Sequence, residues 1–214
     1  MIKAVLFDMD GVLVESEEYI TLAGMEMFRE KGVEVQFEDF KEFTGMGENR
    51  FLGGVAKKHG VDFNVEKDKA RTYEIYGELV KGKLEPLNGV REFIDRCRSN
   101  NLKIAVATSA DRIKMEINLE EMGIPESEFD ATINALEVEN KKPDPEIFIK
   151  AAGKLKQDPA NCLVIEDAVS GVEAALEAGC RCLALTTSFT KKELQKAHWI
   201  ASDLSEAPDD CLNW

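Results

Sequence analysis

Short apolar segments recur along the chain and alternate with longer segments of helical periodicity. Six such segments lie at residues 2–7, 102–107, 129–133, 163–165, 182–185 and 199–201. Continuous apolar runs such as IKAVLF at 2–7 are typical of strands buried on both faces of a parallel sheet. Strands that alternate with helices predict an α/β fold, here a Rossmann-like parallel sheet with helices on both faces.

One interval is too long for this simple alternation. About 90 residues separate Asp10 from Leu102, whereas a βαβ unit needs only about 30. The interval contains no strand-like run, and its patterns are helical at 17–31, 38–43, 48–59 and 66–81. We therefore predict an all-helical cap domain over residues 16–86, inserted after the first strand of an α/β core made of residues 1–15 and 87–214.

Composition excludes several classes of protein. The chain is 44% hydrophobic and carries a formal charge of −14, so it resembles a globular protein and is a poor partner for nucleic acid. No segment approaches the roughly 20 apolar residues of a membrane helix. The five cysteines have no metal-binding spacing, which predicts free thiols in a reducing compartment. We expect a cytoplasmic monomer that binds a small molecule, with no nucleic-acid or membrane partner.

Polar residues cluster where ligands bind in open parallel sheets, beyond the carboxyl ends of the strands. These positions hold four carboxylates, two hydroxyls and one ammonium: Asp8, Asp10, Thr108, Ser109, Lys142, Glu166 and Asp167. Four carboxylates in one place repel each other unless a hard cation binds or protons are taken up. An all-oxygen set favours Mg²⁺. The pattern therefore predicts a magnesium site at this edge.

The same residues can process a phosphate ester. Lys142 and Thr108 can hold phosphoryl oxygens. A carboxylate next to the phosphorus can attack it and form an aspartyl phosphate. A second carboxylate can protonate the leaving alcohol and later deprotonate the attacking water.

The ordered segments Asp8-Met-Asp10-Gly-Val, Thr108-Ser109, Lys142-Pro143 and Glu166-Asp167 resemble the four motifs of the haloacid dehalogenase superfamily. The strings FDMDGVLVESE, KKPDPEIF and VIEDAVSGVEAALEAG are similar to its beta-phosphoglucomutase-like phosphatase branch, whose helical cap follows the first motif. FTGMGENRFLGGVA and TSADRIK are similar to the hydrolase domain of plant and algal suppressor-of-quenching proteins. This likeness adds an organelle stroma as a compartment, if the chain is an excised domain.

The resemblance implies a role for each motif residue. Asp8 is the nucleophile and a Mg²⁺ ligand, and Asp10 is the general acid/base, with its backbone carbonyl on the metal. Thr108, Ser109 and Lys142 bind the phosphoryl group. Asp167 is a direct metal ligand, and Glu166 is a second or an outer ligand. In the cap, Arg50 and Arg71 are candidates for contacts with anionic groups of the substrate, although each can also be a plain surface charge.

Three positions depart from the pattern of the relatives. Glu15 stands where many have Asp, Ile20 stands where the mutase has a histidine, and Gly24 replaces an aromatic stacking residue. The last two weigh against mutase activity. The function expected is therefore a Mg²⁺-dependent phosphatase of a small phosphorylated metabolite such as a sugar phosphate.

Three alternatives stay open. They are a sugar phosphomutase of the beta-phosphoglucomutase type, a dehalogenase, and a non-catalytic metabolite-sensing module. The intact acidic motifs disfavour a dehalogenase, because dehalogenation requires neither Mg²⁺ nor an acid/base. The same intact catalytic motifs also disfavour a non-catalytic sensing module.

Overall fold

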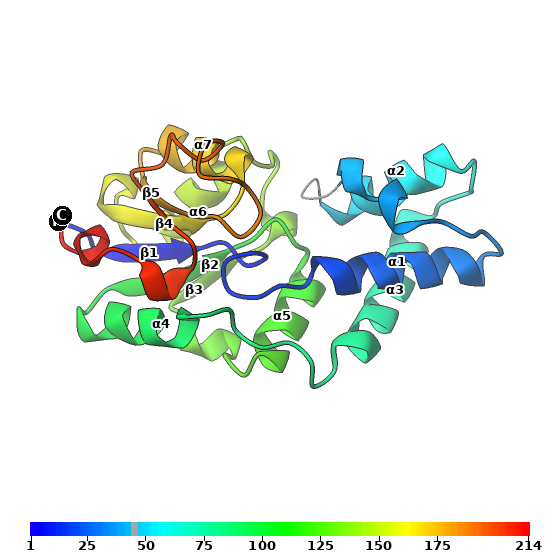
Figure 1. Cartoon of the computed structure of the whole chain (residues 1–214), viewed down its shortest axis with the longest axis horizontal. Helices are drawn as coiled ribbons and strands as arrows, with labels where there is room; N and C mark the ends of the chain where they lie inside the picture. The colour runs from blue at the N-terminus through cyan, green and yellow to red at the C-terminus, as the bar shows by residue number, and fades with distance from the viewer. Residues whose placement is uncertain (44–46) are drawn as a thin grey trace.

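Six parallel strands form one sheet in the computed structural model, which describes residues 1–43 and 47–214 (Figure 1). The strands are β1 (Ala4–Phe7), β2 (Lys103–Ala107), β3 (Ala131–Ile133), β4 (Cys162–Glu166), β5 (Arg181–Leu185) and β6 (Trp199–Ala201). Their spatial order is β3-β2-β1-β4-β5-β6, and every neighbouring pair is parallel. The predicted α/β fold is confirmed.

Helices cover both faces of this sheet. The α-helices are α1 (Glu17–Glu30), α2 (Glu48–Lys58), α3 (Val65–Val80), α4 (Val90–Ser99), α5 (Arg112–Glu121), α6 (Glu146–Lys154) and α7 (Val169–Glu177). Helices α4 and α5 lie on one side of the sheet, and α6 and α7 lie on the other (Figure 1).

The strands divide their side chains between two apolar cores. Successive strand residues point to opposite faces, so Val5 and Phe7 pack in the core with α4 and α5, whereas Ala4 and Leu6 pack with α6 and α7. All four residues of β1 are fully buried. This explains why the strand reads as an unbroken apolar run rather than an alternating one.

In the described residues of the long interval between β1 and α4, helices joined by loops replace strands. The interval contains α1, α2 and α3 and two short 3₁₀ turns, Phe37–Asp39 and Lys41–Phe43. Helices α1 and α3 pack along each other, and the three helices stand beyond the carboxyl ends of the strands (Figure 1). Residues 44–46, part of the FTGMGENRFLGGVA stretch, lie outside the described residues.

A cluster of phenylalanine rings joins α1 to α2. The ring of the buried Phe40 lies 6.3 Å from that of Phe28 and 4.9 Å from that of Phe51. A Cβ atom added at Gly24 would meet Phe40 at 2.9 Å, so a large side chain at this position would displace the ring.

The cysteines and the helix lengths agree with the composition. All five cysteines are free and buried. Among the described residues, no helix is both long and apolar enough to cross a membrane.

The sheet core predicts a large stability effect at Phe93. Its buried ring packs edge-on against Phe7, with the ring centroids 6.1 Å apart. Phe93→Ala should lower the free energy of unfolding by about 3–5 kcal/mol, because it removes apolar contacts and leaves a cavity. Urea unfolding measures this change. The control is Ile113→Ala, at a half-exposed site, and equal losses in the two variants would contradict the packing argument.

Candidate active site

The register of the sheet brings three of the predicted site residues to one edge. Phe7 pairs with Val106 on β2 and with Ile165 on β4. The residues that follow these positions along each strand are therefore neighbours: Asp8 after Phe7, Thr108 after Val106 and Ala107, and Glu166 after Ile165. All three side chains are buried, although each is polar.

Lys142 joins two of the predicted carboxylates. Its Nζ atom lies 2.5 Å from Asp8 Oδ1 and 2.5 Å from Glu166 Oε1, and it sits 4.9 Å above the ring of Phe148. Burial opposes the charge on Lys142, but the two carboxylates outweigh this and raise the pKa of the lysine. The ammonium is therefore held charged at the sheet edge.

The Glu166 carboxylate accepts hydrogen bonds from other groups of the protein on both of its oxygens. Its Oε2 atom accepts hydrogen bonds of 2.9 Å from the backbone N–H groups of Asp167 and Ala168, at the start of α7. A Cβ atom at Gly171 would lie 1.9 Å from the Glu166 carboxyl group, so only glycine allows the helix to pack there. Both oxygens of Glu166 thus have protein donors, which fits an outer place in a metal site.

Three carboxylates at this edge fit a divalent cation. Asp8, Glu166 and Asp167 each offer an oxygen, and these oxygens lie within 4.8 Å of one another. Gly11 has a φ of +73°, and a Cβ atom there would lie 2.0 Å from Asp167 Oδ2, so the glycine leaves room for that carboxylate. Burial raises the pKa of Asp8 to about 7 and that of Asp167 to about 9. A hard cation among these oxygens would offset the cost of their charge.

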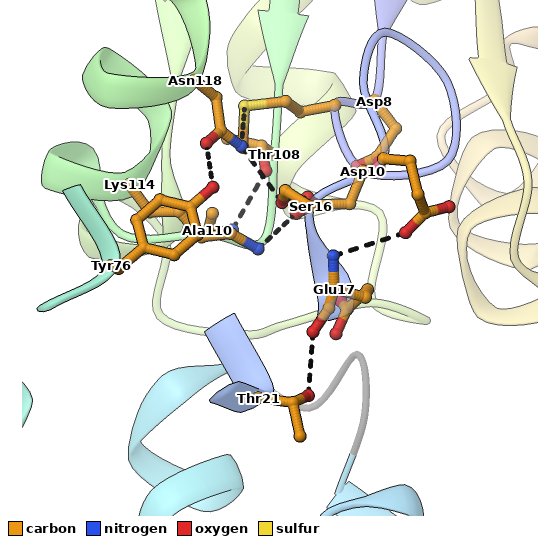
Figure 2. A network of polar contacts seen from close by, with 12 residues as sticks. Asp8, Asp10, Ser16, Glu17, Thr21, Tyr76, Thr108, Ala110, Lys114 and Asn118 are labelled. Atoms are coloured by element: carbon orange, nitrogen blue, oxygen red, sulfur yellow. Dashed lines mark hydrogen bonds and ion pairs between the residues drawn. The ribbon is translucent and has the colours of Figure 1, made fainter. Parts of the chain in front are cut away.

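Asp10 lies outside that group of three and has its own partners (Figure 2). The Ser16 hydroxyl donates to its Oδ1 atom, and Lys114 Nζ lies 2.8 Å from its Oδ2 atom. The Asn118 amide donates to Ser16 Oγ over 3.3 Å, and the Tyr76 hydroxyl donates to Asn118. A buried network from α3 and α5 therefore fixes the orientation of Asp10.

Several residues of the site were not predicted from the sequence. Lys114 is 2% exposed, and a lysine on a helix gives no signal that it turns inward. Thr187 and Ser188 follow β5: the Thr187 hydroxyl donates to the Gly11 carbonyl over 2.6 Å, and the Ser188 hydroxyl donates to Asp167. The rule of polar residues at strand ends, applied to β5, would have identified these two.

The remaining predicted residues differ in their placement. The half-buried Ser109 lines a small pocket beside Asp10. Arg50 is exposed on α2. Arg71 forms a two-bond fork with Glu30, at 2.9 and 2.7 Å, and a further ion pair with Glu74. The structure does not bring Arg71 to the site, and substrate contacts of either arginine stay predictions.

The pocket beside Asp10 lies between the helical segment and the core. The helical segment contributes Glu17, Ile20, Glu48 and Phe51, and the core contributes Asp10 and Lys114. The two parts also meet at an ion pair of 2.5 Å between Lys69 and Asp111.

The crowded carboxylates predict an unusual pH dependence of stability. The folded-state pKa values of Asp8 and Asp167 lie above the unfolded value of 3.8, so the native state binds more protons and its stability falls as pH rises. In metal-free protein, the contribution of these two groups to the free energy of unfolding should fall between about pH 4 and pH 9, by at most about 1.4 kcal/mol per pH unit for each group.

Saturating Mg²⁺ should flatten this slope and raise the Tm above pH 7, because the cation replaces the protons. Asp167→Asn should reduce both the slope and the effect of Mg²⁺, whereas Asp62→Asn, at an exposed site, should change neither. Thermal unfolding across pH measures these effects. A Mg²⁺ effect of the same size in Asp167→Asn would contradict the site.

Similarity to known proteins agrees with this geometry. Residues 2–179 match the family described as haloacid dehalogenase-like hydrolase. The chain is 43% identical over 199 residues to the chloroplastic protein SUPPRESSOR OF QUENCHING 1 of Arabidopsis thaliana, covering 92% of this chain but only 19% of that protein. It is 30% identical to validoxylamine A 7'-phosphate phosphatase of Streptomyces hygroscopicus subsp. limoneus, covering 96% of each chain.

A solved structure has the same fold over its whole length. CbbY from Rhodobacter sphaeroides, in complex with phosphate, has a TM-score of 0.89 and 25% identity, and the match covers the whole of both chains. The resemblance inferred from the four motifs is thereby confirmed. The chain belongs to the haloacid dehalogenase-like hydrolase family.

Proposed function

We propose that this chain is a Mg²⁺-dependent phosphatase that hydrolyses a small phosphorylated metabolite with a sugar-like leaving group. One observation carries the proposal: Asp8, Glu166 and Asp167 cluster around Lys142, with Asp10 held beside them. The names of relatives support the class of substrate, since one is called validoxylamine A 7'-phosphate phosphatase and another is called phosphorylated carbohydrates phosphatase.

The first chemical step is the attack of Asp8 on the phosphorus. Lys142 and Thr108 would hold the non-bridging oxygens of the phosphoryl group. Mg²⁺, held by Asp8 and Asp167 with the Asp10 carbonyl, would neutralise charge on the phosphoryl group. The bond between phosphorus and the leaving oxygen breaks, and Asp10 donates a proton to that oxygen.

Hydrolysis then returns Asp8 to its free form. Asp10, now ionised, takes a proton from a water molecule, and the water oxygen bonds to the phosphorus as the aspartyl bond breaks. Ser16 and Lys114 keep the Asp10 carboxyl group in place during both transfers.

We propose that residues 16–86 form a cap domain that closes over the substrate, on a core made of residues 1–15 and 87–214. The pocket beside Asp10 is walled on one side by α1 and α2 and on the other by the core. Separation of these walls would admit a substrate, and closure would then exclude bulk water. We also propose that the enzyme acts as a monomer in the cytoplasm, or in an organelle stroma if it is part of a longer protein.

Transfer to a second sugar hydroxyl is less well supported than transfer to water. The pocket offers the apolar Ile20 where the mutase pattern has a histidine, and Phe40 fills the space beside Gly24. A phosphorylated sugar would therefore lack these two contacts while it turns to present its second hydroxyl to the phosphoryl group.

Asp8→Asn tests the nucleophile. Because an amide cannot attack phosphorus as a carboxylate does, turnover should fall at least about a thousandfold in kcat. A panel of phosphorylated metabolites, with free phosphate as readout and with Mg²⁺ or EDTA, measures the loss. The matched control is Asp62→Asn, which should retain the turnover of the unmodified protein. Retained turnover in Asp8→Asn would refute the mechanism.

Lys114→Met tests the support of Asp10. Loss of the ion pair should lower kcat/KM for a sugar phosphate about 100-fold, but for acetyl phosphate only about threefold, since acetate leaves without a proton. The pH dependence of kcat should also shift. Lys150→Met, which removes an exposed lysine on α6, is the control. An equal loss on both substrates would show a merely structural role for Lys114.

A further inference from the structure

The pocket beside Asp10 is dominated by carboxylates. Glu17 comes from the first turn of α1, Glu48 begins α2, and Asp10 follows β1, whereas Lys114 from α5 is the cation among these lining residues. Burial opposes the charge of Lys114, but the attraction of these three carboxylates outweighs it and raises the pKa of the lysine. Lys114 is already paired with Asp10 at 2.8 Å. The lining therefore carries more negative than positive charge.

Glu48 has an oxygen without a partner. The residue is 6% exposed, and its Oε2 atom is buried with no hydrogen-bond partner among the described residues. Burying an acceptor without a hydrogen-bond donor is unfavourable, and more so when the group is charged. Such a cost is recovered when a ligand supplies the donor.

Glu17 is a second carboxylate of this pocket whose charge is poorly stabilised. The half-buried side chain lines the pocket, and burial raises its pKa to about 7. Burial raises the pKa of Glu48 as well. Both carboxylates are thus short of the donors or cations that would stabilise their charge.

We infer that the substrate of the proposed phosphatase is a monophosphate whose leaving group presents a hydroxyl or ammonium donor to Glu48, and that this pocket excludes a second phosphoryl group. The inference rests on the proposed function, because it places the leaving group beside Asp10. A hydroxyl or an ammonium gives Glu48 Oε2 its missing hydrogen bond. The apolar side chains of Ile20 and Phe51 can pack on the carbon skeleton.

The exclusion of a second phosphoryl group follows from charge. Such a group carries up to two negative charges and would face Glu17 and Glu48. Repulsion between like charges in this desolvated site should weaken binding of such a group by at least about tenfold. Lys114 cannot offset this without giving up its contact with Asp10.

Binding to the whole 214-residue chain with Asp8→Asn and Mg²⁺ tests the inference, because this background does not consume the ligand. Calorimetry compares fructose 6-phosphate with fructose 1,6-bisphosphate, and glucose 6-phosphate with glucosamine 6-phosphate. We expect the fructose monophosphate to bind at least about tenfold more tightly than the bisphosphate. The second pair shows whether Glu48 prefers a hydroxyl or an ammonium donor.

Changes at Glu48 should alter this preference. Glu48→Arg should reduce the ratio of the two fructose affinities at least about tenfold, because a cation replaces the carboxylate. Glu48→Gln keeps the shape and should reduce the ratio by about threefold, which preserves the test if the arginine variant does not fold. The control is Glu78→Gln, at an exposed glutamate of α3, for which the ratio should not move.

Three results would overturn the inference: bisphosphate binding within twofold of the monophosphate, ratios that neither Glu48 variant changes, or no measurable binding of any monophosphate. A failure of the proposed function looks different. In that case, the protein with Asp8 intact releases no phosphate from these four compounds or from acetyl phosphate, while the binding ratios still decide the inference.

Discussion

The crowding of carboxylates around one ammonium is the constraint on which the rest of the site depends. Lys142 bridges Asp8 and Glu166, and Asp167 stands within reach of both. In water these charges would separate, but the parallel strands hold them together. The burial that raises the pKa values of Asp8 and Asp167 also prepares the edge for a cation, because a cation removes the cost of that burial.

The architecture serves to maintain this arrangement. The central strands β1 and β4 carry Asp8 and Glu166 in adjacent registers, and two glycines permit close packing. Gly11 makes room for Asp167, and Gly171 makes room for Glu166. The helices inserted after β1 complete the site from the other side, where Glu17 and Glu48 face Lys114 across a small pocket. Under the proposed function, the core would carry the phosphoryl chemistry and the proposed cap would select the leaving group.

Much of the fold and the centre of the site could be predicted from the sequence. Buried parallel strands read as apolar runs, and the polar residue after each run marks the sheet edge, so Asp8, Thr108 and Glu166 follow from local pattern. Lys114 could not be predicted, because its inward direction depends on how α5 packs against Asp10. Arg71 was a candidate on charge alone, but tertiary packing places it against Glu30 on the surface. Interactions between distant segments are not encoded in local periodicity.

The central claim is that Asp8 becomes phosphorylated, and mass spectrometry can test this directly. Asp10→Asn protein with Mg²⁺ is treated with acetyl phosphate, quenched in acid and digested. Acetate needs no proton to leave, whereas hydrolysis of the aspartyl phosphate needs the missing base, so the intermediate should accumulate. The account predicts one phosphoryl group on the peptide that contains Asp8, and none when Asp8→Asn is added. A phosphoryl group on another residue, or none on the peptide that contains Asp8, would contradict it.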